Sequence, residues 1–311
     1  MPPVAASSAL RRWSVAALAA NIGIVLTGGV VRVTGSGLGC PEWPRCDGTS
    51  WVPTDGVSEG LHSAIEFGNR MLTFAVVTVA IGAFVAAWRQ RQERPDLFRL
   101  AAVLPFGVVL QALWGGLTVI TDLHPLVVAS HFLLSAALVA AAVLLVARAH
   151  DRHRTAVPSS PASRRLGLAT ATIAGVVLVL GTLVTGSGPH AGDAEAARLA
   201  LDIRAIAVAH ADAVWLLLGV TAALLVVVRG GADRGLERAA WLLVGLELTQ
   251  GAIGYSQYAL GVPAGLVAVH ILGAILVWAA AVNVTVVACA RPAAPDADLQ
   301  PAMPVAQSLP A

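Results

Sequence analysis

The sequence predicts an all-α integral membrane protein, with eight transmembrane helices arranged as two pseudo-symmetric four-helix bundles. Of its 311 residues, 57% are apolar and only 12% are charged, whereas a soluble domain has about 25% charged residues. Eight apolar runs each reach the ~20 residues that cross a bilayer. The peptide VTGSG occurs at residues 33–37 and again at 184–188, which divides these runs into two sets of four.

The expected helices follow the apolar runs in chain order. They span residues 14–33, 59–88, 97–120, 126–147, 166–186, 205–228, 239–258 and 264–288. Residues 1–13 form an N-terminal segment, 14–148 the N-terminal half, and 166–288 the C-terminal half. The linker at 149–165 is rich in Pro, Ser and Arg and is expected to be flexible. The Pro- and Ala-rich tail at 289–311 is expected to be disordered.

Arginine predicts the orientation of these helices. All 20 basic residues are Arg, and they cluster before the first run and after the second, fourth, sixth and eighth. The positive-inside rule then places both termini in the cytoplasm of a cell whose plasma membrane the chain spans. Because the Arg residues flank apolar segments, they indicate lipid as a partner and not nucleic acid.

The two halves repeat beyond VTGSG. Gln111 and Gln250 each open a similar stretch and are 139 residues apart, and His131 and His270 are also 139 residues apart. The halves therefore share one topology, as parallel repeats do.

Four histidines lie near the starts of even-numbered helices, which run inward from the outer side. His131, His210 and His270 are about 10 Å below the outer end at 1.5 Å per residue, with Glu66 at the same depth and His62 at about 5 Å. Imidazoles facing one another across a four-helix unit suit bis-axial ligation of haem iron. The alternative is a set of buried histidines hydrogen-bonded across helices. Zinc or copper fits less well, because no Cys or carboxylate completes a set around His210 and His270.

The start of the second helix concentrates polar residues. His62, Glu66 and Asn69 are spaced by four and three, so they share a face. Ionisable groups inside a bilayer cost several kcal/mol and are usually functional. For Glu66 the structural alternative is an ion pair with Arg70, four residues on.

Other charged residues could serve the same site. Arg70 needs a partner, either Glu66 or a haem propionate. Arg32 and Arg204 lie near outer helix ends, where propionate binding and snorkelling both explain them. Asp212 and Glu247 could relay protons or hydrogen-bond a ligand histidine.

Two of the three cysteines lie close together in the first outer loop. Cys40 and Cys46 are expected to form a structural disulfide on the oxidising side of the membrane. A redox role remains open, in which the pair exchanges with a thioredoxin-like thiol–disulfide partner.

The motifs together resemble the haem A synthase family over residues 14–288. They are LTGGVVRVTGSGLGCPEWPRC, IEFGNRM, GGLTV followed by HFLLSAAL, AHADAVW, and VHILGAIL. The resemblance implies oxidation of the C8 methyl of haem O to a formyl group by two successive hydroxylations. It implies haem b between His210 and His270, haem O as substrate in the N-terminal half, and a catalytic glutamate at Glu66. Haem O synthase, an unidentified electron acceptor and a second copy of the chain are possible partners.

One position departs from the family pattern. The family commonly has Glu-x-x-His where this chain has Glu66 and Asn69, and Asn69 takes the place that His210 fills in the other half. An amide is a poor iron ligand, so either His131 alone binds the substrate iron or His62 supplies a second bond. The family's second outer cysteine pair is also missing.

Two other functions compete with haem A synthesis. A di-haem b-type electron-transfer cytochrome shares the histidine pattern but does not need Glu66. A transporter with inverted repeats is disfavoured, because repeats of four helices are parallel.

Overall fold

The structure is a computed structural model, and it describes residues 5–54, 60–151, 154–155 and 159–292. Within these ranges it contains eight α-helices and one pair of two-residue strands. The helices are α1 (Ser8–Val33), α2 (Gly60–Trp88), α3 (Pro95–Ile120), α4 (Pro125–Ala149), α5 (Pro161–Ser187), α6 (Ile203–Val228), α7 (Arg234–Ala259) and α8 (Ala264–Ala288). The strands β1 (Arg154–Thr155) and β2 (Arg291–Pro292) pair in parallel.

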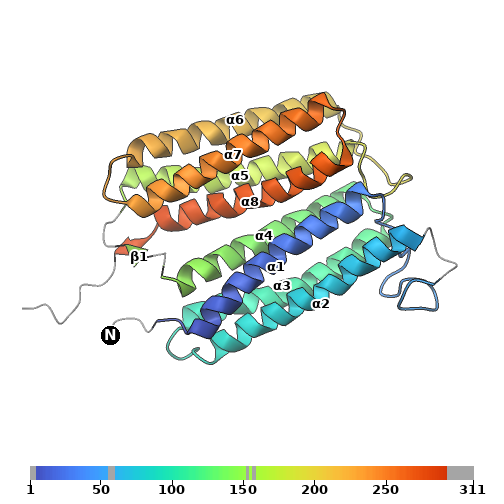
Figure 1. The fold of residues 1–311 in the computed structure, drawn as a ribbon, viewed down its shortest axis with the longest axis horizontal. Coiled ribbons are helices and arrows are strands. Elements are labelled where there is room, and N and C mark those ends of the chain that lie inside the picture. The colour runs from blue at the N-terminus through green and yellow to red at the C-terminus, as the bar shows by residue number, and fades with distance from the viewer. Residues whose placement is uncertain (1–4, 55–59, 152–153, 156–158, 293–311) are drawn as a thin grey trace, which may run out of the picture.

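The helices form two four-helix bundles, as the sequence predicted. Figure 1 shows α1–α4 together on one side and α5–α8 on the other, with successive helices running in opposite directions. Helices α1 and α4 pack against α8, and α4 also packs against α5, so these four helices form the contact between the halves.

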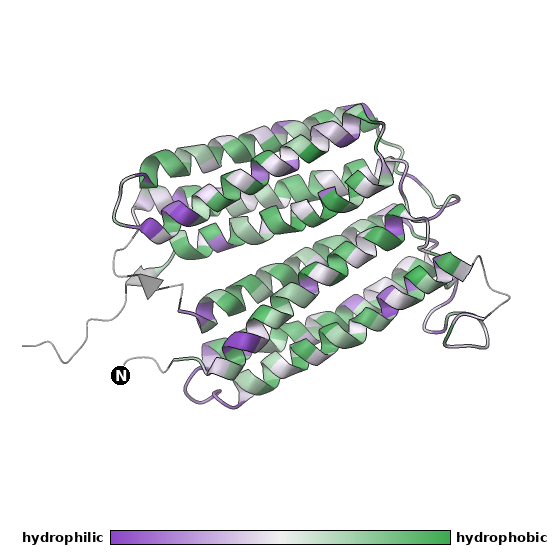
Figure 2. Ribbon diagram, viewed as in Figure 1, coloured by the Kyte–Doolittle hydropathy of each residue, from purple (hydrophilic) through white to green (hydrophobic). Residues whose placement is uncertain are grey.

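Seven of the described helices are long and apolar enough to cross a membrane. Figure 2 shows hydrophobic residues dominating along the helices and hydrophilic ones concentrated toward helix ends and loops. The exception is α7, which begins with Arg234, Glu237 and Arg238 and carries Glu247 near its middle. Its 26 residues still span about 39 Å at 1.5 Å per residue, and it packs against α6 and α8. The chain is therefore a multi-pass membrane protein.

Several helices begin earlier than hydropathy predicts. Helix α1 begins at residue 8 and not 14, α5 at 161 and not 166, and α7 at 234 and not 239. The reason is capping: Ser7, Ser160 and Asp233 each accept a hydrogen bond from a backbone amide in the first turn. Residues 161–165, expected in the linker, are thus helical. The disorder expected of the tail falls largely on residues 293–311, which lie outside the described residues.

The two halves share part of their core. One buried cluster belongs to the N-terminal half and one to the C-terminal half. A third joins the halves and includes Val25, Val139, Leu178 and Ile275. Trp278 Nε1 also donates to the carbonyl oxygen of Ala136 at 2.7 Å. Burial across this contact fixes the halves relative to each other.

Candidate functional site

A cavity of about 1650 Å³ lies among the helices and is lined by residues of both halves. Ligand pockets usually measure ~300–1,000 Å³, so this one has room for more than one large ligand. His131, His210 and His270 line it, together with Glu66 and Asn69. The structure thus brings together three of the four histidines that the sequence singled out.

In the C-terminal half, His210 of α6 and His270 of α8 both line the cavity. His210 Nδ1 is 3.1 Å from the carbonyl oxygen of Val177 on α5. Because a carbonyl only accepts, Nδ1 carries the proton and Nε2 keeps its lone pair. His270 Nδ1 is buried and has no hydrogen-bond partner within the described chain.

His131 of α4 repeats the setting of His270 in the N-terminal half. Each histidine is the seventh residue of its helix, about 9 Å along the axis. The Nδ1 atom of His131 is likewise buried without a partner among the described residues. Gln111 Nε2 donates to the His131 carbonyl at 3.2 Å, and Gln250 Nε2 donates to the His270 carbonyl at 2.7 Å. The repeat therefore preserves the surroundings of the histidine as well as its position.

Each cavity histidine rests against a glycine. A Cβ atom at Gly115 would lie 3.3 Å from Cε1 of His131, and one at Gly254 would lie 3.2 Å from Cε1 of His270. Gly181 bears the same relation to His210, at 3.2 Å. Carbon atoms normally approach to about 3.5–4.0 Å, so any side chain here would push the ring. Gly115 and Gly254 are again 139 residues apart.

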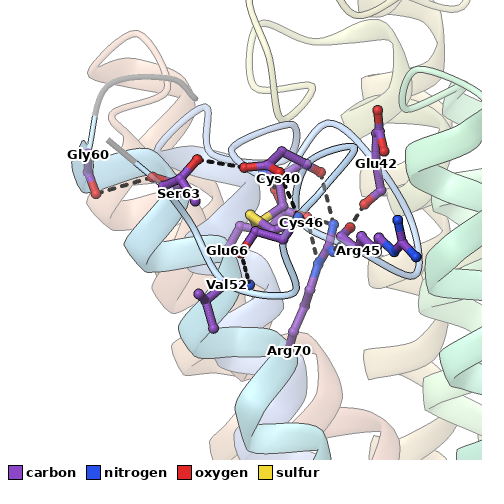
Figure 3. Close-up of a disulfide and its surroundings, with 12 residues drawn as sticks. Cys40, Glu42, Arg45, Cys46, Val52, Gly60, Ser63, Glu66 and Arg70 are labelled. Carbon is purple, nitrogen blue, oxygen red and sulfur yellow. Dashed lines mark hydrogen bonds and ion pairs between the residues drawn. A yellow bond between two sulfur atoms is a disulfide. The ribbon is translucent and has the colours of Figure 1, made fainter. Parts of the chain in front are cut away.

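Glu66, in the second turn of α2, lines the cavity and is only 6% exposed. Its Oε1 accepts from Arg70 Nη2 at 2.5 Å and Arg70 Nε at 3.1 Å, which confirms the i,i+4 ion pair. Its Oε2 accepts from the backbone amide of Cys40 at 2.6 Å. Figure 3 shows that this carboxylate joins α2 to the disulfide loop.

Arg70 completes the attachment of that loop. Its Nη2 donates to Cys40 O at 2.9 Å, and its Nη1 donates at 3.1 Å to both Glu42 O and Arg45 O (Figure 3). Together with the two bonds to Glu66, these use the five N–H donors of a guanidinium. All five N–H donors of Arg70 are thus directed at protein atoms. The contact between Arg70 and a haem propionate, which the sequence suggested, stays a prediction.

The disulfide between Cys40 and Cys46 is present, as predicted. The segment that follows the disulfide is ordered by Asp47, which accepts from Ser50 N at 2.9 Å and from Thr54 Oγ1 at 2.7 Å. Hydrogen bonds, led by that of Thr54, hold the pKa of Asp47 below its usual range. Trp43 from the same loop reaches the cavity wall.

We expect the double substitution Cys40→Ser, Cys46→Ser to destabilise the protein by about 2–4 kcal/mol, because the open loop gains freedom when unfolded. Thermal unfolding in detergent would show a lower midpoint. Cys289→Ser is the matched control, since Cys289 is a free cysteine. Peptide mapping without reductant should recover the linked pair, and two alkylated free thiols from intact cells would contradict the bridge.

His62 lies apart from the other three histidines. Its Nδ1 is 2.9 Å from Ser36 Oγ, in the segment after α1. The sequence suggested His62 as a second ligand of the substrate iron, but His62 is not among the described residues that line the cavity.

The remaining charged candidates occupy different surroundings. Arg32 lines the cavity and donates to the carbonyls of His190 at 2.7 Å and Thr185 at 3.1 Å, which links the halves. Arg204 is exposed at the cavity rim. Glu247 is 4% exposed, accepts from Thr221 at 2.9 Å and lines the cavity. Asp212 is exposed on α6 and is absent from the described cavity wall, so it does not hydrogen-bond a ligand histidine there.

Sequence reasoning missed the glycines beside the histidines and recognised Gln111 and Gln250 only as markers of the repeat. The signal was available, because the 139-residue offset joins Gln111 to Gln250 and Gly115 to Gly254 as well as the histidines. Only the structure shows that these repeated residues contact the imidazoles or their carbonyls. The role of Thr27, which bonds to Asn69, had no sequence signal.

Fold and site together define a class: a multi-pass, all-α membrane protein with two repeated four-helix halves and a shared cavity walled by histidines and a buried glutamate. A sequence profile described as cytochrome oxidase assembly protein matches residues 11–282. The chain belongs to this family, the haem A synthase family that its motifs resemble.

Individual relatives are similar over part of the chain. A protein named heme A synthase from Listeria welshimeri serovar 6b is 34% identical over 137 residues, 44% of this chain and 44% of the relative. One from Shouchella clausii is 33% identical over 129 residues, 41% and 42% of the two chains. One from Lysinibacillus sphaericus is 34% identical over 137 residues, 44% and 43%. The matched stretch thus spans less than half the length of these relatives.

Proposed function

We propose that this protein is a haem A synthase, which oxidises the C8 methyl of haem O to a formyl group and supplies haem A for cytochrome oxidase. Family membership and the names of the relatives support this function. The observation that carries it is the cavity wall, where a buried glutamate in one half accompanies repeat-related histidines in both.

The C-terminal half holds haem b between His210 and His270 in this proposal. The residues fit such a group. The two imidazoles face one cavity, His210 presents Nε2 as a lone-pair donor, and glycines leave room beside both rings. When bound, haem b supplies one-electron redox chemistry. The chain contributes ligand orientation through the Val177 carbonyl and the Gln250 amide.

The N-terminal half holds the substrate haem O, with His131 as the iron ligand. The setting of His131 matches that of His270 in its glycine, its glutamine and its unpartnered Nδ1. His62 Nδ1 lies 2.9 Å from Ser36 Oγ, so the proposal gives His62 a contact with the loop after α1 and no bond to the iron.

Glu66 is the catalytic residue of the proposal and acts as a proton acceptor near the oxidised methyl. A carboxylate offers about four lone-pair positions. Arg70 donates two hydrogen bonds to Oε1 and the Cys40 amide donates one to Oε2, while the Glu66 side chain lines the cavity. The two partners also hold the carboxylate still, and a fixed base is what proton abstraction requires.

The setting of the reaction is also proposed. The protein lies in the plasma membrane with both termini in the cytoplasm, and the disulfide loop faces outward. Haem O comes from a haem O synthase, and electrons leave to an acceptor outside this chain. A thiol–disulfide partner at Cys40 and Cys46 and self-association are further proposed contacts.

Pigment analysis tests the function directly. Cells that make haem O but lack haem A synthesis should produce haem A when they carry this chain. Production of haem A separates the enzyme from the di-haem cytochrome, which would bind haem and leave haem O unchanged. Spectral haem b without any haem A or alcohol intermediate would favour the cytochrome.

A second prediction concerns the glycine beside His270. Gly254→Val should displace the ring, at an overpacking cost of about 1–3 kcal/mol, and lower the haem b content of purified protein. Gly245→Val on the same helix is the control, because a Cβ there meets nothing within 4 Å. Equal haem b in the two variants would contradict the role given to Gly254.

A further inference from the structure

The two halves differ at the position opposite the repeated histidine. His210 of α6 lines the cavity together with His270, whereas Asn69 of α2 lines it together with His131. Asn69 and His210 are 141 residues apart, close to the 139 that relates the other pairs. The C-terminal half thus offers two imidazoles, and the N-terminal half offers one imidazole and one amide.

In both halves the first helix orients this residue. In the C-terminal half, Val177 of α5 accepts from His210 Nδ1. In the N-terminal half, Thr27 of α1 donates to Asn69 Oδ1 at 2.7 Å. The amide oxygen is therefore occupied by Thr27, and the NH₂ group is the remaining polar group of the side chain. Among the described residues, Asn69 hydrogen-bonds through its amide oxygen and not through its NH₂ group. Asn69 lines the cavity, whereas Thr27 is not among the described residues that line it.

We propose that the N-terminal half binds its haem through His131 alone and uses the Asn69 amide as a hydrogen-bond donor to a small ligand on the opposite face of the iron. An amide NH₂ donates two hydrogen bonds and binds iron poorly, so it suits a polar diatomic ligand or water and not the metal. The site therefore takes a small axial ligand of the dioxygen type. This inference rests on the proposed function, because it needs a haem in the N-terminal half.

The difference between the halves has a chemical consequence. Two histidines fill both axial positions of an iron and leave none for an external ligand. One histidine leaves a position open, and Asn69 is the residue placed to stabilise what binds there. The repeat thus yields one closed site and one open site from the same scaffold.

Carbon monoxide is the probe for the open position. Purified full-length protein loaded with haem and reduced with dithionite should bind carbon monoxide at one of its two haems. Asn69→His should abolish this binding and convert the responding haem to a six-coordinate, low-spin spectrum. Asn69→Leu should keep the binding but raise the C–O stretching frequency, because a hydrogen-bond donor has been removed. The low-spin spectrum of the C-terminal haem reports folding in each variant.

Each outcome is decisive. A wild-type protein in which both haems are loaded and neither binds carbon monoxide would overturn the inference while leaving the proposed function intact. If His62→Ala then restored binding, His62 would be the second ligand. An unchanged stretching frequency in Asn69→Leu would overturn the donor role of the amide. Failure of the N-terminal half to take up haem under any condition would instead count against the proposed function itself.

Discussion

Glu66→Gln is expected to stop haem A formation, with a fall of about 10²–10⁴-fold in turnover, while haem b content stays near that of the parent protein. Gln keeps the shape of the side chain and loses the base. Haem O or an alcohol intermediate should then accumulate in the pigment extract.

The ion pair offers a competing explanation for any defect. Glu66 also binds Arg70 and the Cys40 amide, so its replacement could loosen the disulfide loop without touching chemistry. Gln can keep an acceptor oxygen toward only one of these partners. A structural role alone predicts that protein yield and haem b fall together and that the surviving protein remains active.

Arg70→Gln is the matched control, since it breaks the same ion pair and three contacts to loop carbonyls but leaves the carboxylate. We expect it to lower yield more than Glu66→Gln and to retain more haem A per haem b. Product analysis normalised to haem b separates the cases. Near-normal haem A per haem b in Glu66→Gln would make Glu66 a structural residue.

His210→Ala and His270→Ala are each expected to abolish the low-spin spectrum of haem b, because one remaining imidazole cannot fill both axial positions. Each substitution removes one imidazole from the cavity wall. The other histidine keeps its hydrogen bond, which is that of His210 with the Val177 carbonyl or that of the His270 carbonyl with Gln250. Visible and electron paramagnetic resonance spectra of the purified variants provide the measurement.

His124→Ala is the control for these variants, because His124 is the cap residue before α4 and is not among the described residues that line the cavity. It should keep the low-spin signal at its parental amplitude. An unchanged low-spin spectrum in both His210→Ala and His270→Ala would remove the assignment of haem b to this pair.

Much of the site could be predicted from residue spacing. The repeat placed His131 and His270 at equivalent positions, and in the structure both are the seventh residue of their helices. The i,i+4 relation of Glu66 and Arg70 gave their ion pair as the structural alternative to a functional role, and the pair is present as a local contact within one helix. The disulfide was also local, because its two cysteines have a sequence separation of six.

Other features depended on segments far apart in the chain. Spacing gave His62 a place beside Glu66, yet the segment after α1 folds over the start of α2 and brings Ser36 to its ring. The same fold turns Arg70 toward three loop carbonyls, which no helical pattern could indicate.

The sequence by itself determined the class, the eight helices, the repeat and the depth of the histidines, because hydropathy and helical rise act within single segments. Only the tertiary structure decided which side chains share the cavity, how the halves join through their common core, and that Thr27 turns the Asn69 amide. These depend on helix rotation and on contacts between distant segments. Packing fixes both, and a one-dimensional pattern does not contain them.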